Sequence, residues 1–163
     1  MTTTATSPTA TSPAAVRAGT NLLPVPAVVR DTGLLLARVL LGAVLIVHGG
    51  QKLFSNGIEG TGAFFESMGV PAAQAAAAFA GTVELVGGIL LVLGALTQLV
   101  AVLVVVVMAG AYLYVHQAAG IYAADGGWEL VAVIGLAVAV FGLVGPGRYS
   151  VDALIAGRRA AKA

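Results

Sequence analysis

The sequence predicts an all-α integral membrane protein, a four-helix transmembrane bundle, and three observations support this. Hydrophobic residues make up 59% of the 163 residues and charged residues only 9%, whereas soluble domains carry roughly 25% charged residues. The mean hydropathy is +0.99. Four apolar segments are each close to the ~20 residues that a helix needs to cross the hydrocarbon core. Because so few charges cannot cover a surface in water, we expect the lipid bilayer to solvate much of the chain.

The four predicted membrane-spanning helices cover about residues 33–53, 72–96, 99–117 and 128–144. Residues 54–71 are polar and contain several glycines, so they are predicted to form a loop, and Pro71 marks the start of the next helix. Thr97 and Gln98 are the only polar residues between the second and third segments, where a tight turn is required. After the fourth segment, Ser150 is suited to cap a short helix that reaches about Gly157.

The ends of the chain differ in composition from the bundle. Residues 1–30 are rich in Thr, Ser, Pro and Ala and show no periodic apolar face, so we expect a disordered cytoplasmic tail. The apolar run after Arg30 is too long for a signal peptide, which favours a retained anchor. Residues 31–157 would form the membrane domain, and residues 158–163 a basic tail suited to anionic lipid.

The distribution of basic residues predicts the orientation in the membrane. Four crossings place both termini on one side, and the terminal flanks carry most of the positive charge. These residues are Arg17, Arg30, Arg148, Arg158, Arg159 and Lys162. By the positive-inside rule, both termini face the cytoplasm.

Composition also excludes several functions. A formal net charge of +1 gives no general attraction to nucleic acid, and the absence of cysteine excludes disulfides, thiolate metal sites and dithiol redox chemistry.

Six ionisable residues fall within or at the edge of the predicted spans: Arg38, His48, Lys52, Glu84, His116 and Glu129. A charged group at the centre of a membrane helix costs about 2.5–3.5 kcal/mol, so such residues are candidates for function. At 1.5 Å per residue, Glu84 lies roughly 18 Å and His48 roughly 22 Å from the cytoplasmic helix ends, close to the midplane. His116, Lys52 and Glu129 lie nearer the outer surface.

Helical periodicity groups these residues further. Arg38, His48 and Lys52 share one face of the first helix at 100° per residue, so any of the three is a possible partner for the Glu84 carboxyl group.

Two further faces support an interior site. Gly81 and Gly88 share a face with Glu84, and such small residues let membrane helices approach closely. Met108, Tyr112 and His116 share a face of the third helix at i, i+4 and i+8.

Structural interpretations remain open for three residues. Arg38 could extend to the cytoplasmic surface, Lys52 could anchor a helix end at the interface, and Glu129 beside Trp128 could stabilise a helix N-terminus through the helix dipole.

Several sequence blocks resemble the DoxX family, small four-helix membrane proteins of bacteria. The blocks are Arg38-Val-Leu-Leu-Gly42, His48-Gly-Gly-Gln-Lys-Leu-Phe54, Met68-Gly-Val-Pro71, Glu84-Leu-Val-Gly-Gly88, Trp128-Glu129 and Gly145-Pro-Gly-Arg-Tyr-Ser-Val-Asp152. The resemblance covers about residues 33–155 and implies a multi-pass protein of the bacterial cytoplasmic membrane. The family takes its name from a membrane subunit of a thiosulfate:quinone oxidoreductase. The six ionisable residues are the positions that the resemblance carries over.

The functional hypothesis is a redox-associated subunit of a membrane oxidoreductase system with a quinone-type site. Its catalytic residues would be Glu84, His48 and His116, and its binding or relay residues Arg38, Lys52, Tyr112 and Glu129. Other membrane or redox subunits would be its partners. Three alternatives remain open. One is a structural or assembly subunit, and another is a small proton-coupled transporter, although no inverted repeat is evident. The third is a metal or haem protein, which the absence of a Glu-x-x-His pair and the presence of only two histidines disfavour.

Overall fold

The computed structural model describes residues 25–162, and these residues form helices and connecting turns without any strand. The first spanning helix is α1 (Ala27–Gly50), which continues without a break into a π-helical turn, η2 (Gln51–Ser55). The helices α2 (Gly57–Ser67), α3 (Ala73–Leu93) and α4 (Thr97–Ala111) follow. A second π-helical turn, η3 (Tyr112–His116), extends α4.

The remainder of the chain contains the last spanning helix and a terminal helix. Two short 3₁₀ turns, η4 (Gln117–Ala119) and η5 (Ala123–Asp125), lead to α5 (Glu129–Val144), and α6 (Val151–Ala160) ends the described chain. Within residues 25–162, three helical stretches are long and apolar enough to cross a membrane: Ala27–Ser55, Ala73–Leu93 and Thr97–Ala119. Helix α5 is equally apolar but shorter, with 16 residues. The predicted membrane helix bundle is therefore confirmed.

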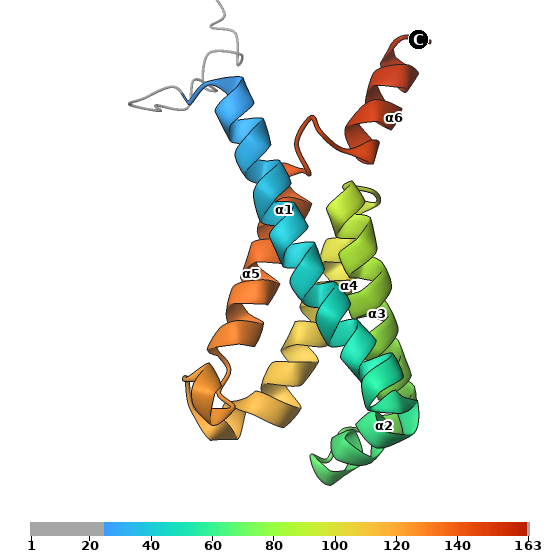
Figure 1. Ribbon diagram of the computed structural model, residues 1–163, viewed down its shortest axis with the longest axis vertical. Coiled ribbons are helices and arrows are strands. Elements are labelled where there is room, and N and C mark those ends of the chain that lie inside the picture. The colour runs from blue at the N-terminus through green and yellow to red at the C-terminus, as the bar shows by residue number, and fades with distance from the viewer. Residues whose placement is uncertain (1–24, 163) are drawn as a thin grey trace, which may run out of the picture.

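The helices form two arms that meet at one end of the molecule (Figure 1). In one arm, α1 packs along α3, and α2 packs on the far end of α3. In the other arm, α4 packs along α5. The arms are joined by the short turn between α3 and α4, and from this turn they diverge. We call this the closed end. The first residues of α1 and all of α6 lie at the closed end too (Figure 1).

Glycines set the close approach of α1 and α3. A Cβ atom added to Gly88 would lie 2.7 Å from the carbonyl oxygen of Gly42 and 2.9 Å from the backbone nitrogen of Ile46. Gly49 faces the backbone of Gly81 and Leu85 in the same way. The contact therefore runs backbone to backbone, as small residues allow in membrane helices, and the predicted role of the small residues flanking Glu84 agrees with this packing.

The apolar core is built from α1, α3, α4 and α5. Its most buried members are Leu45, Leu91, Val100, Val104 and Val138. By contrast, α1 and α5 present large apolar side chains outward, as expected for surfaces in contact with lipid. Leu40, Val47, Leu136 and Leu143 are examples.

Two sequence-based assignments within the bundle need correction. Residues 54–71, expected as a loop, contain the eleven-residue helix α2. Its glycines weaken the helix propensity, but α2 is held by tertiary contacts because the buried Thr61 and Gly62 face its neighbours. The turn between α3 and α4 lies at Gly94–Leu96, not at Thr97 and Gln98, which are the first residues of α4. Both Gly94 and Leu96 adopt positive φ angles, which end one helix and redirect the chain.

The ends of the chain also differ from expectation. Helix α1 begins at Ala27, six residues before the predicted start, and α6 runs three residues past Gly157. Both expected domain boundaries, 30/31 and 157/158, therefore fall inside helices. Residues 1–24 of the expected tail lie outside the described residues. The predicted cap of α6 is confirmed, because the Ser150 hydroxyl accepts a hydrogen bond from the Ala153 amide.

Candidate functional site

A cavity of about 440 Å³ lies between the two arms, in the half of the bundle away from the closed end. Its walls are predominantly apolar and come from every long helix of the bundle. The side chains that matter for its chemistry are His48, Lys52, Glu84, Met108, Tyr114 and His116. Cavities of this size and composition, with a few converging polar groups, are typical of small-molecule sites.

An ion pair between Lys52 and Glu84 stands in the cavity wall. The Lys52 Nζ atom lies 2.6 Å from Oε2 of Glu84, whose side chain is 4% exposed. Gly81 makes room for this pair, since a Cβ atom there would meet the side chains of Leu53 and Lys52. Of the three partners that the sequence allowed for Glu84, the structure selects Lys52. The two partners are buried to different extents, because 23% of the Lys52 side chain remains exposed.

Lys52 belongs to the π-helical turn η2, and this turn has a specific support. In a π-helix the backbone bonds run from residue i to i+5, which widens the turn and leaves backbone groups in need of other partners. The buried Thr61 hydroxyl of α2 donates a hydrogen bond of 2.9 Å to the Lys52 carbonyl oxygen. Helix α2 thus holds the segment that presents the Lys52 ammonium to the cavity.

His116 lines the opposite wall, within the second π-helical turn, η3. Its Nδ1 atom lies 2.6 Å from the carbonyl oxygen of Gly126. Because a carbonyl oxygen can only accept, Nδ1 must carry the hydrogen. In the neutral ring Nε2 is then a hydrogen-bond acceptor. His48, which is half-buried on α1, also lines the cavity.

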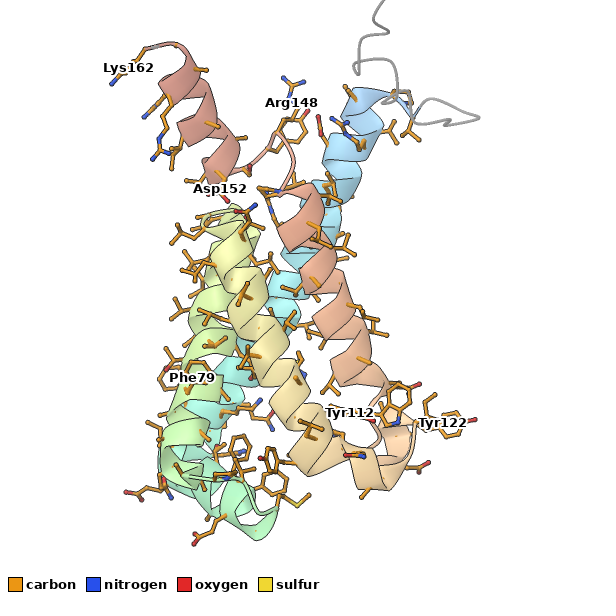
Figure 2. The ribbon with its side chains drawn as sticks, turned by 180° about the vertical axis from the view of Figure 1, so that it is seen from behind. Phe79, Tyr112, Tyr122, Arg148, Asp152 and Lys162 are labelled. Carbon is orange, nitrogen blue, oxygen red and sulfur yellow. The ribbon has the colours of Figure 1, made fainter. Side chains whose placement is uncertain are left out.

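Other residues in the predicted site lie elsewhere. Glu129 accepts a hydrogen bond of 2.7 Å from the Ala123 amide and so organises the loop before α5. The Tyr112 ring packs edge-on against Trp128, with 6.0 Å between the ring centroids. Figure 2 shows Tyr112 at the end of its arm near this loop. Tyr114 lines the cavity, whereas Tyr112 does not, because the wider π-helical turn alters the α-helical spacing on which the predicted face depended.

Arg38 lies at the closed end, far from the cavity. Only 1% of this residue is exposed, so it does not extend to the surface. Its guanidinium donates hydrogen bonds of 2.9 Å to the Pro146 carbonyl and 2.5 Å to the Tyr149 carbonyl. Arg38 therefore fastens the segment between α5 and α6 onto α1. Among the predicted site residues, the structure gathers Glu84, Lys52, His48 and His116 and separates Arg38, Tyr112 and Glu129 from them.

Asp152 is a structural residue that sequence reasoning did not single out. Its Oδ1 and Oδ2 atoms accept hydrogen bonds of 2.9 Å from the Leu96 amide and 3.0 Å from the Thr97 amide. The first amides of α4, which lack partners within their own helix, are thus capped from α6. Figure 2 shows Asp152 directly beside this turn. The residues around Thr97 do not predict this cap, because the acceptor lies 55 residues from Thr97 along the chain.

The candidate site has no clustered metal-ligand set. Within residues 25–162, no group of three or more His, Cys, Asp or Glu side chains is placed to hold a metal ion. His116 and Glu129, two of the ligands weighed from the sequence, are instead bonded to backbone groups of the loop.

Fold and site together define a class: a small multi-pass helical membrane protein with an ion pair in the wall of an apolar cavity. The model of the DoxX family matches residues 33–117. The chain belongs to the DoxX family, which confirms the resemblance stated from the sequence blocks.

Two relatives are similar to this chain. It is 34% identical over 136 residues to "Uncharacterized membrane protein Rv3486" of Mycobacterium tuberculosis (strain ATCC 25618 / H37Rv), a match that covers 76% of this chain and 82% of the relative. It is 40% identical over 85 residues to "Putative oxidoreductase CatD" of Bacillus subtilis (strain 168), covering 52% of this chain and 60% of CatD. The chain thus spans about three fifths of CatD. No solved structure matches the chain.

Proposed function

We propose that this protein is a membrane subunit of an oxidoreductase system and that the cavity between its arms is a quinone-type site. One observation carries the proposal: the buried Glu84 carboxylate and the Lys52 ammonium stand in the wall of a predominantly apolar cavity. An ion pair that only joins two helices needs no cavity beside it, whereas a ligand site needs one. The name of the relative CatD, an oxidoreductase, agrees with this class of function.

The polar groups suit a quinone headgroup, which carries two carbonyl acceptors and becomes a pair of hydroxyl donors on reduction. The Lys52 ammonium, with Nζ hydrogens beyond the one given to Glu84, can donate to a quinone carbonyl. On the opposite wall, the His116 Nε2 atom can accept a hydrogen bond from a quinol hydroxyl. Glu84 and His48 are positioned to exchange protons with the ligand.

Reduction of a quinone to a quinol takes two electrons and two protons. The protons are exchanged through the cavity residues, but the chain has no cysteine and therefore no dithiol to supply electrons. We therefore assign the electrons to a redox-active partner subunit at the membrane, and the present chain to ligand binding and proton transfer.

Binding of chainless benzoquinone and naphthoquinone to the protein in nanodiscs tests the proposal. Trp128 is the only tryptophan of the chain, and its neighbour Gly127 lines the cavity, so saturable quenching of tryptophan fluorescence reports on occupancy. The double variant Lys52→Met/Glu84→Leu should weaken binding about tenfold or more, since a hydrogen bond from a charged group contributes about 1.5–3 kcal/mol. Glu66→Gln, which changes an exposed carboxylate of α2, is the matched control.

The double variant also separates this proposal from a purely structural role. Replacing both members of a buried ion pair by apolar residues is often neutral for stability, whereas removing one member leaves an unpaired charge. If the pair serves only to join α1 to α3, the double variant should fold and still bind quinone as the wild type does. That result, or the absence of saturable quenching with either quinone in the wild type, contradicts the proposal.

A further inference from the structure

The cavity reaches the lipid-facing surface between α3 and α4. Several residues that line it are exposed, among them Phe79 of α3 at 46% and Val106 of α4 at 55%; Phe64 of α2 at 50% and Leu130 of α5 at 44% are exposed lining residues as well. Figure 2 shows Phe79 on α3. Side chains that line a cavity and are also exposed define an opening. We call this opening, bounded by Phe79, Val106, Gly110 and Tyr114, the α3–α4 mouth.

Gly110 keeps the α3–α4 mouth open. It lines the cavity, and a Cβ atom added to it would meet no atom within 4 Å. Glycine in a helix costs about 1 kcal/mol relative to alanine, so a glycine there invites a packing explanation. Gly42, Gly49 and Gly88 have one, because they contact the backbone of a neighbouring helix. A Cβ atom at Gly110 would meet none, so the space beside this residue of the cavity lining is open.

Polarity changes along this path. The ion pair of Lys52 and Glu84 lies inside, with the Glu84 side chain 4% exposed. Toward the surface, the mouth is lined by the rings of Phe79 and Tyr114, the side chain of Val106 and the bare backbone of Gly110, so the Tyr114 hydroxyl is a polar group on a mainly apolar rim. A ligand that fits this gradient has a polar head and an apolar chain, and it enters head first.

We propose that the site takes a bilayer-dissolved amphiphile that enters sideways through the α3–α4 mouth, its head at Lys52 and its alkyl or isoprenoid chain running out past Gly110 into lipid. This rests on the proposed quinone-type site and assigns its substrate class: quinones that carry a long apolar chain. The route also explains why the cavity opens on a surface that faces lipid, since such ligands are concentrated in the bilayer.

The test compares a decyl-substituted naphthoquinone with chainless naphthoquinone in the same fluorescence titration. The variant Gly110→Leu fills the mouth and leaves the polar pair unchanged. Gly33→Leu is the matched control: Gly33 is also a helical glycine with no atom within 4 Å of an added Cβ, but it lies near the start of α1 and outside the cavity lining. Both substitutions raise helix propensity, so neither should unfold the protein.

We expect Gly110→Leu to weaken binding of the decyl quinone at least tenfold and to change binding of the chainless quinone less than twofold, with Gly33→Leu changing neither. Val106→Phe, on the same rim of the mouth, should act in the same direction. Unchanged decyl-quinone binding in both rim variants overturns the route and leaves the quinone site standing. Equal loss of both quinones in Gly110→Leu overturns it too, because position 110 would then belong to the head pocket. If the wild type binds neither quinone, the proposed function itself fails.

Discussion

Asp152 joins two parts of the chain through one carboxylate. It caps the start of α4 from the first turn of α6, with both of its oxygens engaged by backbone amides. Burial by itself would raise the pKa of Asp152, but the hydrogen bonds from Thr97 and Leu96 and the nearby charge of Arg38 outweigh it and lower that pKa below its ordinary value of 3.8. The ionised form is therefore the one that stabilises the fold.

The variant Asp152→Asn should lower the free energy of unfolding by about 1–2 kcal/mol at neutral pH, because an amide cannot accept both hydrogen bonds. Since the folded pKa is depressed, this contribution is fully present above pH 3.8 and disappears as the pH falls through the lower folded value. Thermal unfolding in detergent between pH 7 and pH 3 should show a difference in Tm from the wild type that shrinks on acidification. A difference that grows would contradict the assignment. Asp125→Asn, in an exposed loop at the opposite end, is the control.

Depth along the helices was enough to select two residues of the cavity wall from the sequence. Counting along the helices placed Glu84 and His48 near the midplane, and both line the cavity. Counting could not choose the partner of Glu84, because that choice depends on how α1 rotates against α3. It could not anticipate the position of Arg38 either, since the acceptors of Arg38 are carbonyls more than 100 residues away.

Contacts between helices determine how the side chains of the site are arranged. The crossing of α1 and α3 positions Lys52 beside Glu84, and this crossing depends on backbone contact at Gly42 and Gly88. Since a methyl group there would meet backbone atoms and not a movable side chain, the helices themselves would have to separate.

The variant Gly88→Ala should therefore destabilise the protein by about 1–3 kcal/mol, the usual cost of overpacking. The same change at Gly33, where an added Cβ meets nothing, should be neutral or stabilising by up to about 1 kcal/mol. Unfolding of both variants in mixed detergent micelles measures the contrast. Equal effects at the two positions would show that the α1–α3 contact is looser than described.

The elements themselves were predictable where the apolar pattern is long. The three long apolar helices and the shorter α5 were recognised from segment length and hydropathy, and the cap of α6 from Ser150. Helix α2 and the two π-helical turns were missed for a common reason. Glycine content and standard helical spacing describe local preference, whereas α2 is stabilised by contacts with α3 and η2 by a hydrogen bond from Thr61.

Side-chain hydrogen bonds join the segments at the closed end of the molecule, and the cavity lies toward the opposite end. Both Arg38 and Asp152 tie the segments at the closed end, where the basic residues of α6 and the start of α1 also lie (Figure 2). The positive-inside rule predicts that the closed end faces the cytoplasm and that α2 and the loop before α5 face the outer side of the membrane.

Labelling of introduced cysteines tests this orientation, since the chain has none of its own. The variant Ser67→Cys, at the exposed end of α2, should react with a membrane-impermeant maleimide in intact bacterial cells. Ala160→Cys, at the exposed end of α6, should react only after lysis. The reverse pattern would invert the topology, and reaction of both in intact cells would place the two ends on one side.

The helix bundle as a whole was predictable from the sequence, but the cavity between its arms was not. Composition predicts four apolar helices, but it does not predict that α3 and α4 diverge from a turn at Gly94–Leu96. The angle between these two helices depends on the positive φ of Leu96 and on the cap that Asp152 provides.

The cap on α4 has a consequence for biosynthesis. A ribosome completes the hairpin of α3 and α4 well before it reaches Asp152, which is 55 residues beyond Thr97. Until then, water at the membrane surface must solvate the first amides of α4. We therefore expect a nascent chain arrested before α6 to insert all of its spans and yet remain open to proteases at the α3–α4 turn, with resistance acquired only when the final helix has been translated.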